Sequence, residues 1–379
     1  MNLPEPVPGG AALRAARVGR GWSQSEAARE IAGLGHRRGV PVAAAASLKT
    51  LLSRWENGHV VPEPQYRELL AELFGRTAGE LGIDPEAQPV RAAEGAERLR
   101  AALAGAAAAD HTVVALWREQ LAVAGRLDDE LGTAGAGALV RAQVAQLHHT
   151  LAHTLGAAAR QAVASVLSGA AALAGAQHLD AGEPDLAWEA YRRAHSAAAV
   201  ARRPVAAATA LAGQATVLVE VGEPGPALVL LGDEPPGGPP GATARWSAAV
   251  GLARAAGGQA PAAQAAFGRA EEATRAAVRA AVVPDMFWPS TIDVELDDLH
   301  RRRGHALSLL GDPAAFQPLT GALAAGPTSA RHRGELHADL AVTVAARDPN
   351  AAAAHARQAR AIATRIGSRR IPARLDGAP

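Results

Sequence analysis

Residues 47–58 read SLKTLLSRWENG and carry the pattern of a short amphipathic helix. Leu48, Leu52 and Trp55 recur at i, i+4 and i+7, so they share one apolar face. The opposite face carries four hydrogen-bond donors, Lys49, Thr50, Ser53 and Arg54. A helix with an apolar back and a donor-rich front fits the major groove of DNA, which is roughly 12 Å wide and lined with base-edge acceptors. An ordinary surface helix would show the same pattern, so the flanking sequence is needed to distinguish a DNA-binding helix from an ordinary one.

The length and composition of the chain exclude several classes of protein. Its 379 residues are enough for two or three domains, and the absence of cysteine excludes disulfides and thiolate metal sites. The first residues, MNLPEPVPGG, lack the basic head and apolar run of a secretion signal. The longest nearly apolar stretch, Ala162–Ala176, is too short to span a bilayer. We therefore expect a cytoplasmic, nucleoid-associated protein with no membrane partner.

Charge is distributed unevenly, although the net charge of the whole chain is only +1. Residues 11–55 hold eight basic residues against two glutamates, whereas residues 56–86 hold seven acidic residues against two arginines. A domain with a basic half and an acidic half suits a module that presents one face to phosphate groups.

Five short helices are predicted in a first domain, residues 1–84. They cover residues 10–20, 24–33, 47–58, 64–75 and 78–81. Ser23 followed by Glu26 is a capping box, which starts the second helix at Gln24. A long loop separates the second helix from the third, with a backward extension of the third helix over the alanines at 43–46 as the alternative. The second and third helices thus stand in a helix-turn-helix relation.

Three segments of this domain carry a family resemblance. WSQSEAA at 22–28, LSRWENG at 52–58 and PEPQYRELLAELFG at 62–75 resemble the Xre (phage-repressor-like) helix-turn-helix family. The likeness is greatest to the actinobacterial branch, which joins such a domain to helical repeats. It is specific over residues 10–83 and weaker towards the C-terminus. The resemblance implies an all-α fold with a five-helix lambda-repressor-like domain that binds double-stranded DNA.

The resemblance also implies roles for single residues. Lys49, Thr50 and Ser53 match the base-reading positions of the recognition helix. Gln24, the first residue of the second helix, matches a glutamine that contacts phosphate, where the helix N-terminus also favours an anion. Asn57 matches a residue that meets the phosphate backbone.

Three further positions have weaker or structural roles in the resemblance. Arg54 matches a position at the groove edge, within reach of phosphate or base. Arg17 and Glu56 match a structural ion pair, which is not expected to contact DNA. The chain departs from the family in its longer loop, where Arg37 and Arg38 either contact phosphate or are simply solvated.

The remainder of the chain is helical in pattern and rich in alanine. Gly182, Gly222 and Gly257 are spaced by 40 and 35 residues, and Asp312 and Asp348 by 36. Periods of ~34–40 residues suggest helix–turn–helix repeats of the tetratricopeptide type, stacked as an α-solenoid.

We divide this remainder into three parts. Residues 85–180 are a helical connector that begins with a short linker, PEAQPV, and joins the domains or binds a second subunit. Residues 181–370 are the tetratricopeptide-like domain, and residues 371–379 are a tail.

Aromatic residues mark candidate effector contacts in the repeat domain. Phe287 and Trp288 lie in a segment that breaks the repeat period, and Trp188, Tyr191 and Trp246 lie on repeat helices. Burial in the core is the alternative for each of these residues. The segment around residues 287–288 is the preferred candidate for a binding groove, because aromatic side chains in a loop often have a binding role.

Residue patterns for catalysis or metal binding are weak. His149 and His153 share a helix face but lack a third ligand at a defined spacing, so no metal site is predicted. Acidic residues at 295–298 precede HRRR at 300–303, and we interpret this run as a solvated helix face. Phosphate loops and the common hydrolase motifs are absent, so neither an enzyme nor a cofactor is predicted.

The resulting hypothesis is a sequence-specific transcriptional regulator that acts as a homodimer on DNA. Its repeat domain holds the dimer and senses a peptide or small-molecule effector. The alternative is a protein-interaction scaffold whose helix-turn-helix domain no longer reads DNA.

Overall fold

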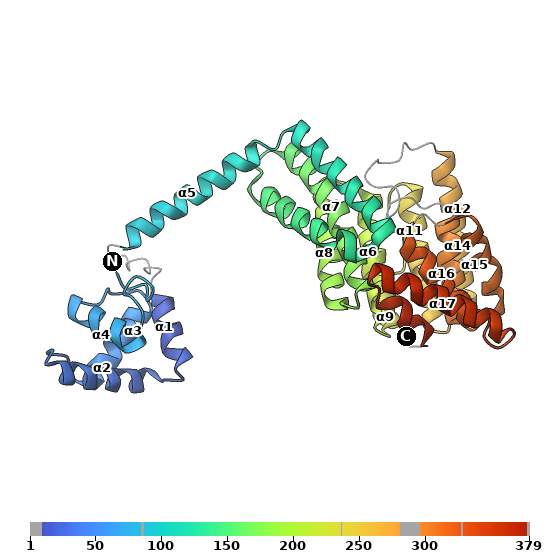
Figure 1. The fold of residues 1–379 in the computed structure, drawn as a ribbon. Coiled ribbons are helices and arrows are strands. Elements are labelled where there is room, and N and C mark those ends of the chain that lie inside the picture. Colours follow the sequence, from blue (N-terminus) through green and yellow to red (C-terminus); the bar gives the residue numbers. More distant parts are fainter. Residues whose placement is uncertain (1–9, 85–86, 236, 281–295, 327–328, 377–379) are drawn as a thin grey trace. The chain divides into compact units, whose positions relative to one another are not determined.

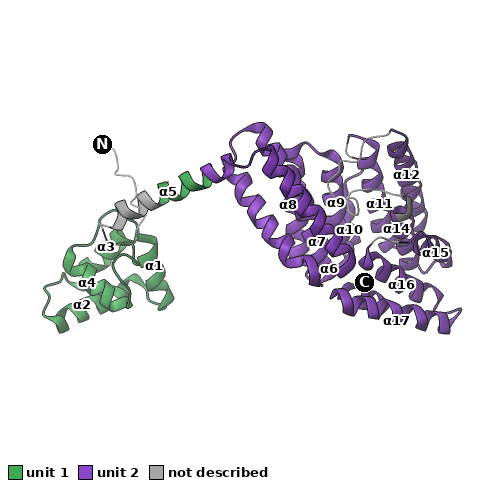
Figure 2. Ribbon diagram, turned by 45° about the horizontal axis from the view of Figure 1, so that its top comes forward, with its two compact units in different colours: residues 1–102 green, residues 103–379 purple. Residues whose placement is uncertain are grey.

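The computed structural model describes residues 10–84, 87–235, 237–280, 296–326 and 329–376, and these residues form helices and connecting turns without a strand. The prediction of an all-α protein is confirmed. The chain divides into two compact units, residues 1–102 and residues 103–379 (Figures 1 and 2). Each unit has its own hydrophobic core.

Unit 1 contains four helices before the connection to unit 2. They are α1 (Gly10–Gly19), α2 (Gln24–Arg38), α3 (Ala45–Glu56) and α4 (Pro64–Phe74). Ser23 and Glu26 form the predicted capping box, in which each side chain accepts a hydrogen bond from the backbone N–H of the other residue. Pro64 occupies the first turn of α4, where its missing N–H costs nothing.

The fifth helix predicted at residues 78–81 is wrong, because these residues form a single turn. Thr77 and Glu80 cap this turn reciprocally, with the Thr77 N–H donating to Glu80 at 2.8 Å. Gly82 then takes a left-handed φ of 70° and ends the turn before a second one can form.

Helix α2 is five residues longer than its predicted end at Gly33. Leu34 continues the apolar face into the core, and Gly35 lies so close to Val42 that a Cβ would clash with it. The helix ends at Gly39, which has a φ of 65°. Arg37 and Arg38 therefore belong to the last turn of α2, where positive charge complements the helix dipole, and not to a loop.

The core of unit 1 collects the apolar faces of its four helices. Leu13, Ile31, Leu48, Leu52 and Leu70 are fully buried in it. The ring of Trp55 packs on that of Tyr66, with the centroids 5.1 Å apart, and the Tyr66 hydroxyl accepts a hydrogen bond from the Ala43 N–H. These contacts fix α3 against α4 and leave the other side of α3 uncovered.

Helix α5 (Ala87–Ala107) includes most of the segment that we expected to be a short linker. The boundary between the two units falls within this helix, between residues 102 and 103. Residues 87–90 of the expected linker are thus helical.

Unit 2 is built from helices joined by tight turns. They are α6 (His111–His153), α7 (Ala157–Asp180), α8 (Pro184–Ala201), α9 (Pro204–Glu220), α10 (Pro224–Leu231), α11 (Pro240–Ala256), α12 (Ala260–Arg279), α14 (Leu296–Leu309), η1 (Pro313–Ala315), α15 (Phe316–Ala324), α16 (Ala330–Val344), α17 (Pro349–Ile366) and α18 (Arg370–Leu375). Gly182 and Gly222 have left-handed φ values in the turns that the sequence spacing located, whereas in the third of these turns the left-handed residue is Gly258 and not Gly257. A proline in the first turn of most of these helices restarts the chain in helical conformation.

Helices of unit 2 pack mainly on their neighbours in sequence, but its last helices also contact its first ones. Helices α16 and α17 contact α6, and α18 contacts α7. At Gly132 the long helix α6 is interrupted by a φ of 63°, and a Cβ there would overlap Ile366 of α17. The described helices of unit 2 therefore surround a shared interior.

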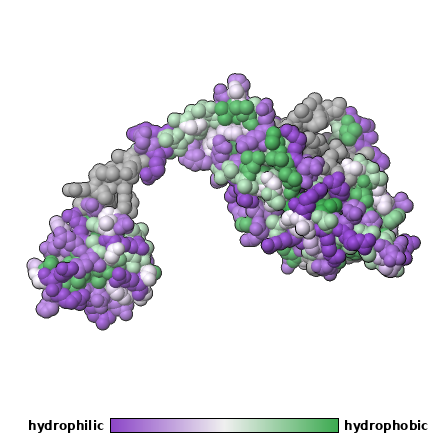
Figure 3. All heavy atoms as spheres, in the orientation of Figure 1, coloured by the Kyte–Doolittle hydropathy of each residue, from purple (hydrophilic) through white to green (hydrophobic). Residues whose placement is uncertain are grey.

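Helix α7 is long and apolar enough to cross a membrane by length and composition, in contrast to the expectation from its shorter apolar stretch. In the structure, 78% of its apolar window is buried, and a core helix passes the same test. Figure 3 shows that the visible face of unit 1 is mainly hydrophilic, whereas unit 2 has apolar patches among polar ones.

Candidate nucleic-acid interface and internal polar network

Helix α3 has one buried and one exposed face, as its sequence predicts. Leu48 and Leu52 have no exposed surface and Trp55 is 3% exposed. On the other side, Lys49, Thr50 and Arg54 are exposed, and Ser53 is half-buried. The apolar face thus anchors α3 to the core while the polar side chains extend towards solvent.

The end of α3 is defined by Gly58 rather than by Asn57. Gly58 takes the left-handed φ of 69°, whereas Asn57 has an ordinary φ of −93°. The exposed side chain of Asn57 donates from Nδ2 to the carbonyl oxygen of Ser53 at 2.8 Å. Asn57 therefore caps the helix, with its amide oxygen still free to turn towards a partner.

A buried ion pair connects α1 with the end of α3. Arg17 donates to both carboxylate oxygens of Glu56, from Nε at 2.6 Å and from Nη2 at 3.0 Å. A third hydrogen bond comes from Gln24, whose Nε2 donates to Glu56 Oε2 at 2.8 Å. Glu56 thus joins three helices, and the Gln24 amide that we predicted to contact phosphate is held at the start of α2 by this bond.

The two basic residues at the end of α2 differ in their contacts. Arg38 forms an exposed ion pair with Glu72 of α4 at 2.6 Å. Arg37 is exposed. Of the two predicted phosphate contacts, only Arg37 is therefore available without breaking an ion pair seen in the structure.

Of the candidate effector residues in the second unit, Trp188 and Tyr191 share one hydrophobic cluster, and Trp246 belongs to another. Phe287 and Trp288 lie outside the described residues. Trp246 is 3% exposed in the core, where its Nε1 donates to the carbonyl oxygen of Leu231 at 2.9 Å, so its role as an effector contact is not supported. Trp188 is half-buried, and Tyr191 lines an internal cavity.

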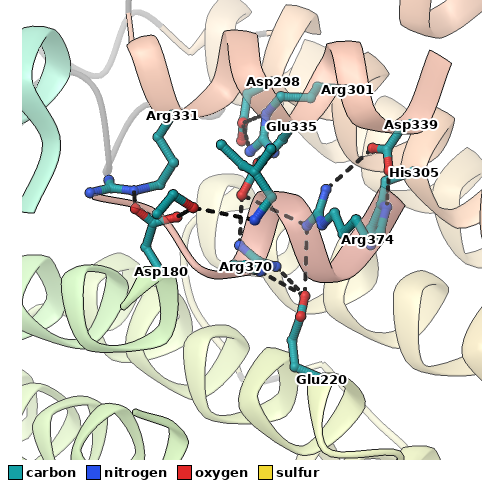
Figure 4. A network of polar contacts seen from close by, with 12 residues as sticks. Asp180, Glu220, Asp298, Arg301, His305, Arg331, Glu335, Asp339, Arg370 and Arg374 are labelled. Carbon is teal, nitrogen blue, oxygen red and sulfur yellow. Dashed lines mark hydrogen bonds and ion pairs between the residues drawn. The ribbon is translucent and has the colours of Figure 1, made fainter. Parts of the chain in front are cut away.

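The interior of unit 2 holds a network of ion pairs that the sequence analysis did not anticipate (Figure 4). Its arginines are Arg301, Arg302, Arg331, Arg370 and Arg374, and its carboxylates are Asp128, Asp180, Glu220, Asp298, Glu335 and Asp339. These residues come from helices α6, α7, α9, α14, α16 and α18. The network therefore ties together the first, middle and last helices of the unit.

Glu335 of α16 lies at the centre of this network. It accepts hydrogen bonds from Arg301 at 2.8 Å and from Arg370 at 2.7 Å, and Arg374 lies 3.7 Å away. Although burial raises the pKa of Glu335, these arginines hold it well below its usual range. The carboxylate is therefore ionised inside the protein.

Two other groups of this interior have shifted pKa values. Burial raises the pKa of Glu220, but Arg370 and Arg374 outweigh this effect and hold it at about 2. Burial and the charge of Arg301 lower the pKa of His332 to about 3. At neutral pH the interior thus contains an ionised Glu220 and an uncharged His332.

Within the described part of the charged run, the interpretation as a solvated face is wrong for Asp298, Arg301 and Arg302 of α14. Asp298 accepts hydrogen bonds from Arg301 at 2.6 Å and from Arg302 at 2.8 Å. Helix α14, which carries them, is packed against α11, α12, α15 and α16, so its charged face points inward. The sequence does place Asp298, Arg301 and Arg302 at i, i+3 and i+4, which is the spacing of an ion-paired helix face. Whether such a face is buried depends on the helices that pack against it, and the spacing does not contain that information.

A cavity of about 150 Å³ lies next to this network. The lining residues from α7, α9 and α11 are mostly small or apolar, among them Ala176, Ala212 and Ala248, but they include Arg245 of α11. Helices α14, α16 and α18 contribute the other arginines of the lining. The lining therefore combines small apolar residues with cationic ones.

Comparisons with protein-family models, with curated proteins and with solved structures found no match to this chain.

Proposed function

We propose that this protein is a sequence-specific transcriptional regulator, in which unit 1 binds double-stranded DNA and α3 enters the major groove. The observation that carries the proposal is that α3 has one buried apolar face and one exposed polar face. Leu48, Leu52 and Trp55 hold its back to the core, while Lys49 and Thr50 project outward. Donors held rigidly on one helix face can read base-edge acceptors.

The charge around α3 supports the same proposal. Basic residues predominate from α1 to α3, and acidic residues predominate from the end of α3 through α4. Arg54 and Arg37 are exposed on the basic part and can contact phosphate, which supplies affinity without sequence preference.

The finer assignment of the fold belongs to this proposal as well. Helices α1–α4 form a lambda-repressor-like helix-turn-helix domain in it, as the resemblance to the Xre family implies. The paired helices of unit 2 form a tetratricopeptide-like domain that holds two copies together and senses an effector. A dimer places its two recognition helices about 34 Å apart on a two-fold site.

Selection of bound sequences from randomised double-stranded DNA tests the proposal with the full chain. Mobility-shift titrations on the selected site then compare variants. Lys49→Ala combined with Ser53→Ala is expected to lose the preference for this site, by about tenfold or more, because base contacts carry specificity. Gln24→Ala is expected to weaken all sequences alike, because phosphate contacts do not distinguish bases.

Arg76→Ala is the matched control, because Arg76 is exposed in the acidic stretch after α4 and its loss removes the same charge as Lys49→Ala. It is expected to bind the selected site as the parent does. Selection that returns no enriched sequence, or a Lys49/Ser53 double variant with unchanged preference, contradicts the proposal.

A protein-interaction scaffold is the second candidate function. Leu116, Val123 and Leu127 are exposed at i, i+7 and i+11 of α6, and such an apolar stripe is typical of a protein contact. Recovery of a stable heterologous partner, together with no enriched DNA in the selection, would favour this function over the first.

A further inference from the structure

The cavity of unit 2 combines features of a small-molecule site. Its lining includes six arginines, among them Arg245, but only two carboxylates, Asp298 and Glu335. The other carboxylates of the network, such as Asp339 and Glu220, are not part of the lining, although each pairs with an arginine of it. The surface that faces the cavity is therefore more cationic than the network as a whole.

Tyr191 is held in this lining in a fixed orientation. Its ring lies between Gly175 of α7 and Gly213 of α9, where an added Cβ on either glycine would overlap the ring. The residue is 9% exposed, and its hydroxyl has no hydrogen-bond partner among the described residues. Burial raises the pKa of Tyr191, and the charges of Arg370, Arg331 and Arg302 act against this rise. A hydroxyl that lines a cavity without a protein partner is an unfilled hydrogen-bonding position.

Arg302 supplies a second unfilled position. Its Nε donates to Asp298 at 2.8 Å, and its two terminal amino groups form no hydrogen bond to a described residue. The side chain is 35% exposed and lines the cavity. A guanidinium with free amino groups binds carboxylate or phosphate oxygens in its own plane.

We infer that the cavity of unit 2 binds a small organic anion, with its carboxylate or phosphate group between Arg302 and the Tyr191 hydroxyl and its apolar body against the alanines of α7, α9 and α11. Cavities of about 150 Å³ accept molecules the size of benzene, which sets the size of the ligand. Burial raises the pKa of Tyr191, so its hydroxyl keeps the proton that it donates to the anion. The inference gives the proposed effector a site and a chemical class, and it does not require DNA binding by unit 1.

Calorimetric titration of the full chain without DNA tests this inference. Benzoate, benzamide and inorganic phosphate are the probes, because benzoate and benzamide differ in charge but hardly in shape. We expect benzoate to bind with a dissociation constant of about 1 mM or lower, and benzamide to bind at least tenfold more weakly. Phosphate binding without benzoate binding identifies a phosphate-bearing ligand, and the reverse identifies a carboxylate.

Two variants locate the bound anion. Tyr191→Phe keeps the ring between the two glycines, and Arg302→Gln removes the free amino groups. Each is expected to weaken binding about tenfold, the effect of one hydrogen bond to a charged group. Arg193→Gln, on the exposed side of the same helix as Tyr191, is the control and is expected to bind as the parent does.

Circular dichroism verifies that each variant is folded. Binding of neither benzoate nor phosphate, equal binding of benzamide, or binding unchanged by both Tyr191→Phe and Arg302→Gln would overturn the inference. A failure of DNA binding leaves these titrations unaffected, so the two proposals fail separately.

Discussion

Asp128 of α6 and Arg331 of α16 form a buried, two-pronged ion pair although 203 residues separate them. Arg331 donates to the two carboxylate oxygens at 2.8 and 3.1 Å, and Gln177 of α7 donates a third hydrogen bond to Asp128 at 2.8 Å. The backbone N–H of Arg369 donates to the carbonyl oxygen of Asp180 nearby. Polar contacts therefore join the last helices of unit 2 to its first ones.

Loss of the Asp128 carboxylate is expected to destabilise unit 2. Asp128→Asn leaves Arg331 buried with only Asp180 as a charged partner, and breaking such a pair costs about 3 kcal/mol. Urea denaturation followed by circular dichroism measures the loss in the transition of unit 2. Glu189→Gln, which breaks the exposed pair with Arg192, is the control and is expected to change stability by less than about 0.5 kcal/mol. Equal effects of both substitutions would refute the structural role of the pair.

The ionised Glu220 is expected to make unit 2 sensitive to acid. Its pKa of about 2 in the folded chain lies below the ordinary 4.5, so its stabilising contribution is complete above pH 4.5. This contribution, about 3 kcal/mol, is lost as the pH falls from about 4.5 to about 2. The free energy of unfolding of Glu220→Gln should therefore depend less on pH in this range.

Denaturation midpoints of the parent and of Glu220→Gln, measured between pH 7 and pH 2, check this prediction. The two curves should converge towards low pH. Glu223→Gln changes an exposed residue in the next turn and should follow the parent throughout. Parallel curves for the parent and Glu220→Gln would show that Glu220 does not carry the acid sensitivity.

Gly213 is expected to be essential for the position of Tyr191. In Gly213→Ala the new methyl group overlaps the Tyr191 ring, and forcing a side chain into a packed interior costs about 1–3 kcal/mol. Gly268→Ala is the opposite case, because Gly268 is exposed in α12 with nothing near its Cβ position. This variant should gain about 0.5–1 kcal/mol from helix propensity. Thermal denaturation of both variants is the measurement, and a stable Gly213→Ala would show that the ring has room to move.

Glu56 is expected to stabilise unit 1 without a direct part in reading DNA. Glu56→Gln leaves the Arg17 charge buried without its carboxylate, at a cost of about 3 kcal/mol. Denaturation should show this loss in unit 1. Glu72→Gln, which breaks the exposed pair with Arg38, should be within about 0.5 kcal/mol of the parent. A Glu56→Gln variant as stable as Glu72→Gln would be inconsistent with the three-helix role of Glu56.

Local features of unit 1 could be predicted from the sequence because they depend on neighbours a few residues apart. The capping box of Ser23 and the two-sided pattern of α3 both follow from side chains within one or two turns. The length of α2 could not be predicted from the same information. Two glycines inside it argue against a helix, and only the contact of Gly35 with Val42 shows why a missing Cβ suits that place.

The sequence by itself determined that the protein is helical, where most turns fall, and which side of α3 is buried, because periodicity and turn residues act over short distances. Only the tertiary structure decided that the charged side chains of Asp298 and Arg302 line the same cavity of unit 2 as Tyr191. The charged residues of a helix face have the same spacing in the sequence whether they are exposed to water or paired with other charges in the interior. The surroundings of the charged face of α14 are set by α11, α12, α15 and α16, so burial of this kind appears only when the chain has folded.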